Sequence, residues 1–346
     1  MNDSKIVRDL TQGSVFKLLI SFSIPFIFAN LLQIFYNITD MIIVGQFVGS
    51  AGLSAVSVGA DLVHMQMLFC MGFSSAGQII VSQYVGMKNT EGLRKFIGTL
   101  FSVLILMGII MTVVGLLSKD WLLGVLNTPA EALSEARDYS TVCFFGTIFT
   151  YGYNLISAIL RGMGDSRRPL LFIGVASVVN ILLDLLFIAV FHMGAFGAAL
   201  ATIIGQAVSL VTSTTYLYRH RDSFYFDFKP KSFRIHGDSL KALFKLGIPL
   251  ALQSCAVSIS QLFISANVNA YGLVISAVNG VGNKISQVAT VITSALSSAG
   301  SAMIGQKRCN VARLCALGFE KVKVFPSETI KKGEIGWRIV AKQCEI

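Results

Sequence analysis

Two acidic side chains lie inside long apolar stretches of this sequence. Asp184 has apolar neighbours on both sides, from Ile181 to Phe187, and Asp40 lies near the end of the first apolar stretch. A carboxylate in hydrocarbon costs about 3 kcal/mol on insertion scales, and an acid retained there is by default a candidate functional group. Such a medium favours the protonated form, so the group could bind and release a proton near neutral pH.

Spacing brings other oxygen donors toward these acids. Asn180 precedes Asp184 by one helical turn and shares its helix face. Asp184 and Thr202 each lie nine residues from a turn centred on Met193, so an antiparallel helix pair places both about 13 Å from that turn. Asp40 lies at a similar depth before the turn that ends the first stretch. We expect these carboxylate, amide and hydroxyl oxygens to converge on a site for a proton or for Na⁺.

Several of these residues have a plainer interpretation. Asp40 could be a solvated interface residue near its helix end, and Asp61, with His64 one turn later, fits an interface or packing role better than a ligand role. Asp184 has the weakest alternative of this kind. Pro25 lies inside the first stretch, where it removes an i→i−4 hydrogen bond and kinks a helix. That kink is compatible both with a hinge and with packing alone.

The elements that must carry these residues are helices long enough to cross a lipid bilayer. Of 346 residues, 54% are hydrophobic and 13% are charged, which leaves too little polar surface to cover a water-soluble globule. The predicted fold class is all-α, a polytopic membrane protein with about eight transmembrane helices, because barrel strands would be short and alternating. The apolar stretches run over about 16–44, 51–82, 96–118, 137–160, 170–191, 195–218, 241–268 and 281–306.

Basic residues fix the expected orientation. They gather at the amino terminus and in the connections after the second, fourth and sixth spans, whereas the other connections hold only Lys119, Arg137 and Lys284. The positive-inside rule then places the amino terminus in the cytoplasm of a cell-membrane protein. This orientation also explains the basic segment 219–245, so no nucleic-acid partner is expected.

Enzyme chemistry has no visible basis in the sequence. The six cysteines and four histidines show no metal-ligand spacing. Nothing resembles a nucleophile elbow or a phosphate loop, so we expect neither an enzyme nor a bound cofactor, only Na⁺ or H⁺ as a coupling ion.

The chain repeats itself along its length. Ser74–Gly77 recurs as Ser297–Gly300 at an offset of 223, and the Ile-Pro pair of Ser23–Pro25 recurs in Gly247–Pro249 at an offset of 224. The first two spans therefore resemble the seventh and eighth in the same orientation. Parallel repeats of this kind occur in transporters, where the substrate path lies between the two halves.

The repeat predicts three segments. Residues 1–225 form a first six-helix bundle, residues 226–306 form a partial second bundle of two helices, and residues 307–346 form an aberrant polar tail. Of the last 40 residues, 13 are charged, and none of their apolar runs is long enough to span. A second unit matching the first would need four more spans, so we expect a truncated version of the repeated architecture.

The segment Arg161–Pro169, Arg-Gly-Met-Gly-Asp-Ser-Arg-Arg-Pro, resembles a signature of the multidrug and toxic compound extrusion (MATE) family. The Ile24-Pro25 opening, the stretch from Asp40 to Gly49 and the duplicated Ser-Ser-Ala-Gly segments are similar to the same family, and the resemblance covers residues 10–306. It implies a twelve-helix antiporter of two six-helix bundles that exports cationic or amphipathic drugs in exchange for Na⁺ or H⁺.

Within that family the chain is similar to the branch related to the DNA-damage-inducible protein F. This resemblance implies coupling residues at Asp40, Asn180, Asp184 and Thr202, which could hold Na⁺, and also at Asn154. It further implies that the first helix bends near Pro25.

The expected function is secondary active transport, a monomeric multidrug efflux antiporter in contact with membrane lipid, or an incomplete and inactive copy of one. Two alternatives stay open. A lipid-linked oligosaccharide flippase of the same superfamily would favour a cleft rich in Arg or Lys, and the spans contain almost none. A non-transporting membrane receptor would be expected to carry a soluble sensor domain.

Overall fold

The structure, a computed structural model, describes residues 15–126, 128, 130–221, 224, 226–269, 290–303, 305–306, 319–326 and 337–343. The elements in chain order are α1 (Val15–Phe47), α2 (Gly49–Gly86), α3 (Thr90–Val125), α4 (Ala130–Gly162), α5 (Arg167–Asp184), the π-helix η1 (Leu185–Val190), α6 (Gly194–Arg219), the 3₁₀ turn η2 (Pro230–Phe233), α7 (Gly237–Asn269), β1 (Phe319–Pro326) and β2 (Trp337–Gln343). Residues 290–303 and 305–306 are also helical.

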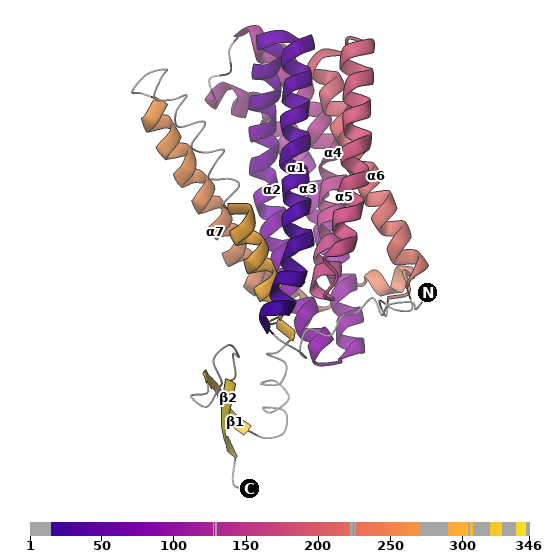
Figure 1. Cartoon of the computed structure of the whole chain (residues 1–346), viewed down its shortest axis with the longest axis vertical. Coiled ribbons are helices and arrows are strands. Elements are labelled where there is room, and N and C mark those ends of the chain that lie inside the picture. Colours follow the sequence, from indigo (N-terminus) through magenta and orange to yellow (C-terminus); the bar gives the residue numbers. More distant parts are fainter. Residues whose placement is uncertain are drawn as a thin grey trace.

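Helices α1 to α6 run side by side as an upright bundle, and α7 leans away from it (Figure 1). Seven helices in the described residues are long and apolar enough to cross a membrane. The prediction of an all-α polytopic membrane protein is therefore confirmed. Part of the eighth predicted stretch, 281–306, lies outside the described residues, and the boundaries at 225 and 306 stay predictions.

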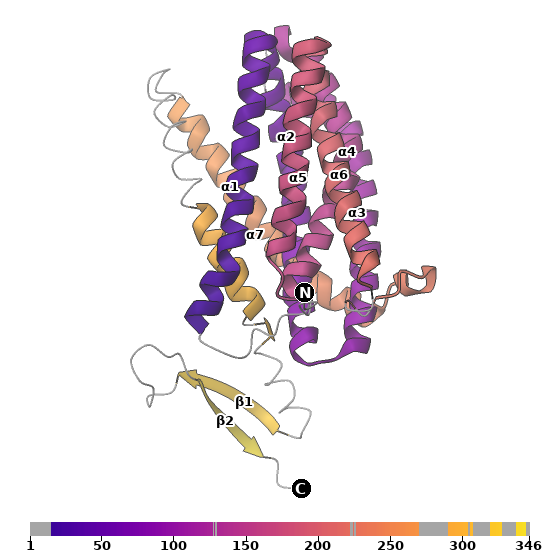
Figure 2. The ribbon, with the colours of Figure 1, turned by 45° about the vertical axis from the view of Figure 1, so that its right-hand side comes forward.

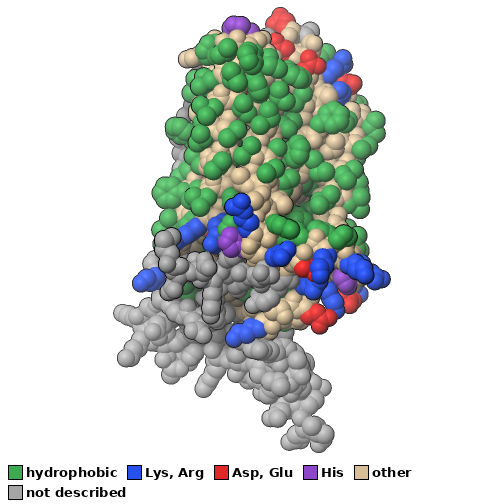
Figure 3. Space-filling view, turned by 90° about the vertical axis from the view of Figure 1, so that its right-hand side faces the viewer, with side chains coloured by type: hydrophobic (Ala, Val, Ile, Leu, Met, Phe, Trp, Pro, Cys, Tyr) green, Lys and Arg blue, Asp and Glu red, His purple; other side chains and the backbone are tan. Residues whose placement is uncertain are grey.

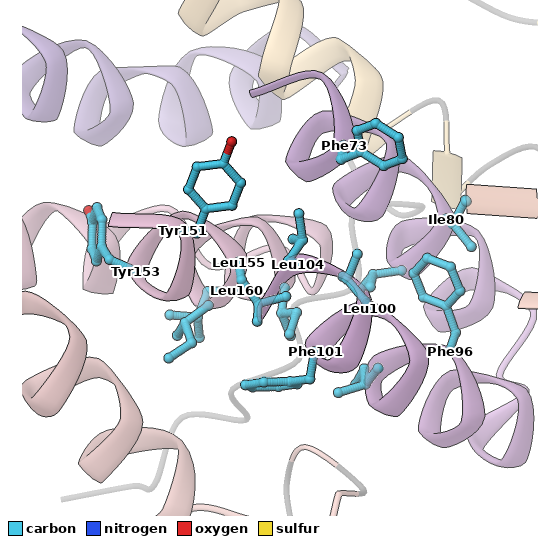
Figure 4. Packing of buried hydrophobic residues seen from close by; sticks show 14 of the residues in the cluster. Phe73, Ile80, Phe96, Leu100, Phe101, Leu104, Tyr151, Tyr153, Leu155 and Leu160 are labelled. Atoms are coloured by element: carbon cyan, nitrogen blue, oxygen red, sulfur yellow. The ribbon is translucent and has the colours of Figure 1, made fainter. Parts of the chain in front are cut away.

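Helix α4 is the centre of the bundle. In its most apolar window 67% of residues are buried, the largest share among the candidate spans. Figure 4 shows Tyr151 and Leu155 of α4 close to Leu100 and Leu104 of α3 in the larger buried cluster. The Tyr151 hydroxyl also donates to the carbonyl oxygen of Gln66 at 2.9 Å. This packing anchors α2 and α3 on α4 and gives the other helices a fixed frame.

The outer surface of the bundle is apolar where lipid would contact it. Figure 3 shows a broad belt of hydrophobic side chains between two charged ends, with Lys and Arg gathered mainly at one end. Large apolar side chains in this belt are open to the surroundings, among them Leu117 at 82% and Phe35 at 69% exposure. An exposed apolar belt of this extent is what a lipid-embedded protein requires.

The helices extend beyond the predicted apolar stretches because their polar ends continue the helix outside the hydrocarbon. Helix α3 begins at Thr90, whereas the apolar stretch begins near residue 96. Its N-cap Asn89 accepts a hydrogen bond from the backbone N–H of Gly92 at 2.8 Å. Capping of this kind satisfies a backbone donor that the first turn leaves unpaired.

The connection between α6 and α7 folds back over the end of α3 as an aromatic cap. Phe226 stacks on Phe101, with ring centroids 5.7 Å apart, and Phe228 and Phe233 meet both rings. Arg94 of α3 pairs with Asp227 of the connection at 2.6 Å. A segment predicted only as a basic loop is therefore an ordered part of the bundle.

The segment predicted to be an aberrant polar tail contains a hairpin. Strands β1 and β2 pair antiparallel, from Lys321 opposite Lys342 to Pro326 opposite Trp337, with a register irregularity between Phe319 and Lys321 (Figure 2). The sequence Lys-Val-Lys-Val within β1 alternates with the period of a strand. Composition predicted only a polar tail with no spanning segment and made no prediction about strands; the boundary of that tail stays a prediction.

Candidate cation-coupling site

Asp184 is the last residue of α5, and its side chain is completely buried, with 0% exposure. Its Oδ1 has no hydrogen-bond partner among the described residues. The π-helix η1 starts at the next residue, and the N–H of Phe191 bonds back to the carbonyl of Leu186. Single π turns inside α-helices occur frequently at functional sites, since they re-aim the neighbouring side chains.

Asn180 connects Asp184 to α6. With its amide oriented to satisfy both neighbours, Nδ2 donates to Asp184 Oδ2 at 3.3 Å and Oδ1 accepts from the backbone N–H of Thr202 at 3.2 Å. Gly205 of α6 permits this approach, because a Cβ there would lie 3.3 Å from both the Ala176 carbonyl oxygen and the Asn180 Cβ. The predicted convergence of Asn180, Asp184 and Thr202 is therefore present in the structure.

Asp40 reaches the same region from α1. It is 8% exposed and its Oδ1 also lacks a hydrogen-bond partner in the described part of the chain. It lies within electrostatic range of Asp184, and Tyr36, one turn earlier on α1, is within range of both carboxyl groups. The plainer interpretation of Asp40 as a solvated interface residue does not fit this burial.

A small cavity lies between α1, α5 and α6, and its lining includes Asn180, the hydrogen-bond partner of Asp184, but neither of the two acids. Tyr36, Asn180, Thr202 and Gln206 supply its polar lining, together with Ser177 and apolar residues. It leaves about 10 Å³ for the centre of a water-sized sphere. Space of that size accommodates about one water molecule or one small ion.

The chemistry of this donor set suits a proton or a hard monovalent cation. Two carboxyl groups, an amide, hydroxyls and a phenol offer oxygen ligands and no sulfur or imidazole. Among the residues that the structure describes, no three His, Cys, Asp or Glu side chains are grouped to hold a metal ion. Two buried carboxylates with unpaired oxygens are costly when both are charged, so uptake of a positive charge stabilises them.

Other residues of this region fall into two groups. The Asn154 amide donates to the Thr150 carbonyl of its own helix at 2.9 Å, and Asn154 does not line the cavity described above. Tyr36 and Gln206 line it and were missed, although Tyr36 is four residues from Asp40 and Gln206 four from Thr202. A search one turn from each predicted ligand would have found both.

A second polar group ties the two sequence repeats together. Arg161 at the end of α4 donates from Nε to Gln78 Oε1 of α2 at 3.0 Å. Gln78 Nε2 donates to both the carbonyl oxygen and the Oγ of Ser298 at 3.0 Å. Nearby, Gly305 packs so closely on Ser82 that a Cβ there would collide with the Ser82 hydroxyl. The duplicated Ser-Ser-Ala-Gly region is thus an interhelical contact between the repeats.

Comparison with known proteins places these features in a family context. The MatE family model matches residues 25–186, which include Pro25, Asp40, Asn180 and Asp184. The chain is 32% identical over 299 residues to the probable multidrug resistance protein YpnP of Bacillus subtilis (strain 168), covering 86% of this chain and 66% of that protein. It is 28% identical to the probable multidrug resistance protein YoeA of the same organism, covering 81% of this chain and 62% of that protein.

Solved structures show the same architecture. A multidrug resistance MATE family transporter of the MOP superfamily, in an outward-facing conformation, has a TM-score of 0.80 at 25% identity, covering 92% of this chain and 71% of that one. The chain spans slightly less than two thirds of the length of the two Bacillus relatives.

Proposed function

Because this chain belongs to the MATE family, we propose that it serves in secondary active transport, exporting cationic or amphipathic small molecules in exchange for Na⁺ or H⁺. The observation that supports this proposal is the pair of buried carboxyl groups on α1 and α5, each with an unpaired oxygen. The printed names of the relatives, which refer to multidrug resistance, point to small organic substrates. The two alternatives, a flippase and a non-transporting protein, gain no support from these relatives.

The proposed coupling starts from the cost of two buried negative charges. A cation or proton bound between Asp40 and Asp184 lowers their combined charge from two negatives to one and draws α1 toward α5 and η1. Loss of that charge restores the repulsion and lets α1 move away. Pro25 lies in α1, where the missing backbone N–H lowers the resistance of the helix to bending. The bend would carry Asp40 relative to Asp184 and so link the charge state to the shape of the substrate path.

We also propose a location, an oligomeric state and an orientation for the chain. It lies in the cell membrane as a monomer. Its amino terminus is in the cytoplasm, because the basic residues gather at one end of the bundle. Membrane lipid is its surrounding solvent. The proposed ion, Na⁺ or H⁺, is the only cofactor-like species.

The experiment reconstitutes the purified chain in liposomes and follows accumulation of a fluorescent cationic dye driven by an outward Na⁺ gradient or an outward H⁺ gradient, so that the ion leaves as the dye enters. The test variant is Asp184→Asn. Its control is Asp61→Asn, which removes an exposed acid of α2 outside the site. We expect the Asp184 variant to lose gradient-driven transport and the Asp61 variant to keep it.

A binding measurement supplements the transport assay. Na⁺ or a lower pH should raise the unfolding temperature of the detergent-solubilised wild type relative to choline chloride at pH 8, and should have little effect on the Asp184 variant. Gradient-driven transport by Asp184→Asn at the wild-type rate would contradict the proposed role of the acid pair.

A further inference from the structure

A second cavity, far larger than the one lined by Asn180, opens near the first turns of α1 and α5. It has a volume of about 580 Å³ and is lined by Lys17, Ile20, Ser21, Ile24, Pro25 and Arg167. Its innermost helix position, Pro25, lies eleven residues before Tyr36, the α1 residue that lines the smaller cavity, which is about 16 Å along the helix axis. The two cavities are therefore separate sites on α1.

The larger cavity is positively charged. Lys17 comes from α1 and Arg167 from α5, and both side chains are exposed. In the described part of the chain neither of them forms an ion pair. The acid nearest to Arg167 in sequence, Asp165, is already engaged by Arg168 and by the backbone N–H groups of Arg167 and Arg168. Among the residues that the structure describes, no acid lines the cavity.

The wall below the cations is apolar and faces the lipid region. Ile20 is 36% exposed and Ile24 is 46% exposed, so both contribute to the apolar belt of the bundle. Pro25 has no N–H to bond the carbonyl of Ser21, which therefore remains an available acceptor in the helix. The Ser21 hydroxyl is also part of the lining. One cation, a free acceptor and the apolar wall thus lie on α1, and the second cation faces them from α5.

We propose that this cavity binds one anionic phospholipid, with its phosphate between Lys17 and Arg167. One acyl chain lies along Ile20 and Ile24, deeper in the membrane than the phosphate. Basic pockets between membrane helices on the side with the basic loops have the chemistry to hold anionic headgroups. The inference requires the membrane-spanning arrangement but not ion coupling.

The occupied cavity would tie the first turns of α1 to α5, on the amino-terminal side of Pro25. A lipid there holds one end of the proposed hinge while the half of α1 that carries Asp40 stays free. Through this site, the lipid composition of the membrane acts directly on α1, the helix proposed to move.

The test measures bound lipid on the purified full chain by native mass spectrometry, with phosphatidylglycerol and phosphatidylcholine titrated separately. The test variant combines Lys17→Gln with Arg167→Gln. Its control combines Arg219→Gln with Lys241→Gln, two exposed cations at the same end of the bundle. We expect the test variant to bind phosphatidylglycerol about thirtyfold more weakly than the wild type. Each cation near an anionic headgroup strengthens binding by about fivefold to sixfold, and the two factors multiply. The control should bind as the wild type does.

Two further measurements keep the proposal falsifiable. Ile24→Asn removes apolar wall without changing charge, and it should weaken binding of long-chain but not of short-chain phosphatidylglycerol. Inorganic phosphate should not compete at millimolar concentration. Equal phosphatidylglycerol binding by wild type and test variant, or full competition by inorganic phosphate, would overturn the lipid site. Asp184→Asn should keep the lipid, which separates this inference from the transport proposal.

Discussion

At the scale of single residues, the buried pair of Asp40 and Asp184 carries a free-energy cost of burial. Asp40 and Asp184 are buried, each has an unpaired carboxylate oxygen, and they lie within electrostatic range of each other. A buried polar atom without a partner costs about 1–3 kcal/mol. Functional sites often carry such costs, because the group must remain available to a ligand.

The first prediction follows from that cost. Asp184→Asn preserves shape and the acceptor for Asn180 but removes the charge, so it should raise the unfolding temperature in Na⁺-free buffer at pH 8, by an amount corresponding to about 1–3 kcal/mol. A thiol-reactive dye can follow unfolding, because Cys70 and Cys143 are buried in the folded chain. A lower unfolding temperature than wild type would show that the carboxylate has a stabilising partner.

The second prediction concerns Asp227 in the α6–α7 connection, outside the spanning helices. A hydrogen bond from Ser232, together with the charge of Arg94, holds the pKa of Asp227 below its ordinary value. A carboxyl group with a lowered pKa stabilises the folded state above its unfolded pKa, about 3.9, and loses this contribution as the pH falls through the folded pKa.

Asp227→Asn should therefore be less stable than the wild type at pH 7, and the difference should shrink below about pH 4. Thermal unfolding at a series of pH values measures it. Glu131→Gln, which changes an acid at the start of α4 with no ion pair in the described structure, is the control and should show no such trend. A pH-independent difference would indicate that shape rather than charge matters at position 227.

Sequence reasoning could recover most of the site at this scale. The helix period and a depth count from one turn were sufficient to bring Asn180, Asp184 and Thr202 together. Burial of Asp40 depends on how α1 rotates against α5, and no local pattern encodes that rotation. Asn154 rested on resemblance alone, and its amide bonds within its own helix.

At the scale of elements, apolar length predicted the helices, and polar detail decided where they begin and end. Hydropathy identifies the part of a helix that lies in hydrocarbon, whereas caps such as Asn89 extend it into the polar region. The sequence gives no signal for the π-helix after Asp184. It covers only six residues, and one extra residue in a single turn does not visibly change the spacing of hydrophobic residues over so short a segment. The hairpin was encoded by alternation that a composition average conceals.

The third prediction concerns the tie between the repeats. Gln78→Leu removes the bonds to Arg161 and Ser298, which leaves a cation and a hydroxyl without their partner. Hydrogen–deuterium exchange in residues 290–303 should accelerate as that helix separates more often from α2.

The matched control is Gln66→Leu, which removes the side-chain hydrogen bond from α2 to the Met111 carbonyl of α3 at 3.0 Å. It should destabilise the bundle without selective acceleration at 290–303. Equal acceleration in both variants would mean that the tie has no special role between the repeats.

At the scale of the whole molecule, charge and apolar area divide the surface into two ends and a belt. The belt suits a lipid surrounding, and the positive-inside rule predicts the direction of insertion from the basic end. This prediction needs only the sequence, because it depends on counts of Lys and Arg in short connections rather than on packing. The relation between the two repeats is less accessible, since it depends on contacts between helices far apart in the chain.

The fourth prediction tests this orientation. In a background without the six native cysteines, Arg219→Cys at the end of α6 should be protected from a membrane-impermeant maleimide in intact cells and should react after lysis. Arg137→Cys in α4 should react in intact cells, because it lies at the opposite end of the bundle. The substitution should be tolerated, because the ion pair that it removes, with Asp120, is exposed and contributes little. The reverse labelling pattern would invert the proposed topology.

The contact between Gly305 and Ser82 has a consequence for how such a chain can evolve. At the repeat offset of 223 these two positions are counterparts, and a part can touch its own counterpart only at a symmetry axis. Two identical serines would crowd each other at that point. Two separate copies of one ancestral subunit must carry the same residue there, whereas a fused gene can place a hydroxyl on one side and nothing on the other. Joining the halves therefore opened a complementary fit that no homodimer could encode.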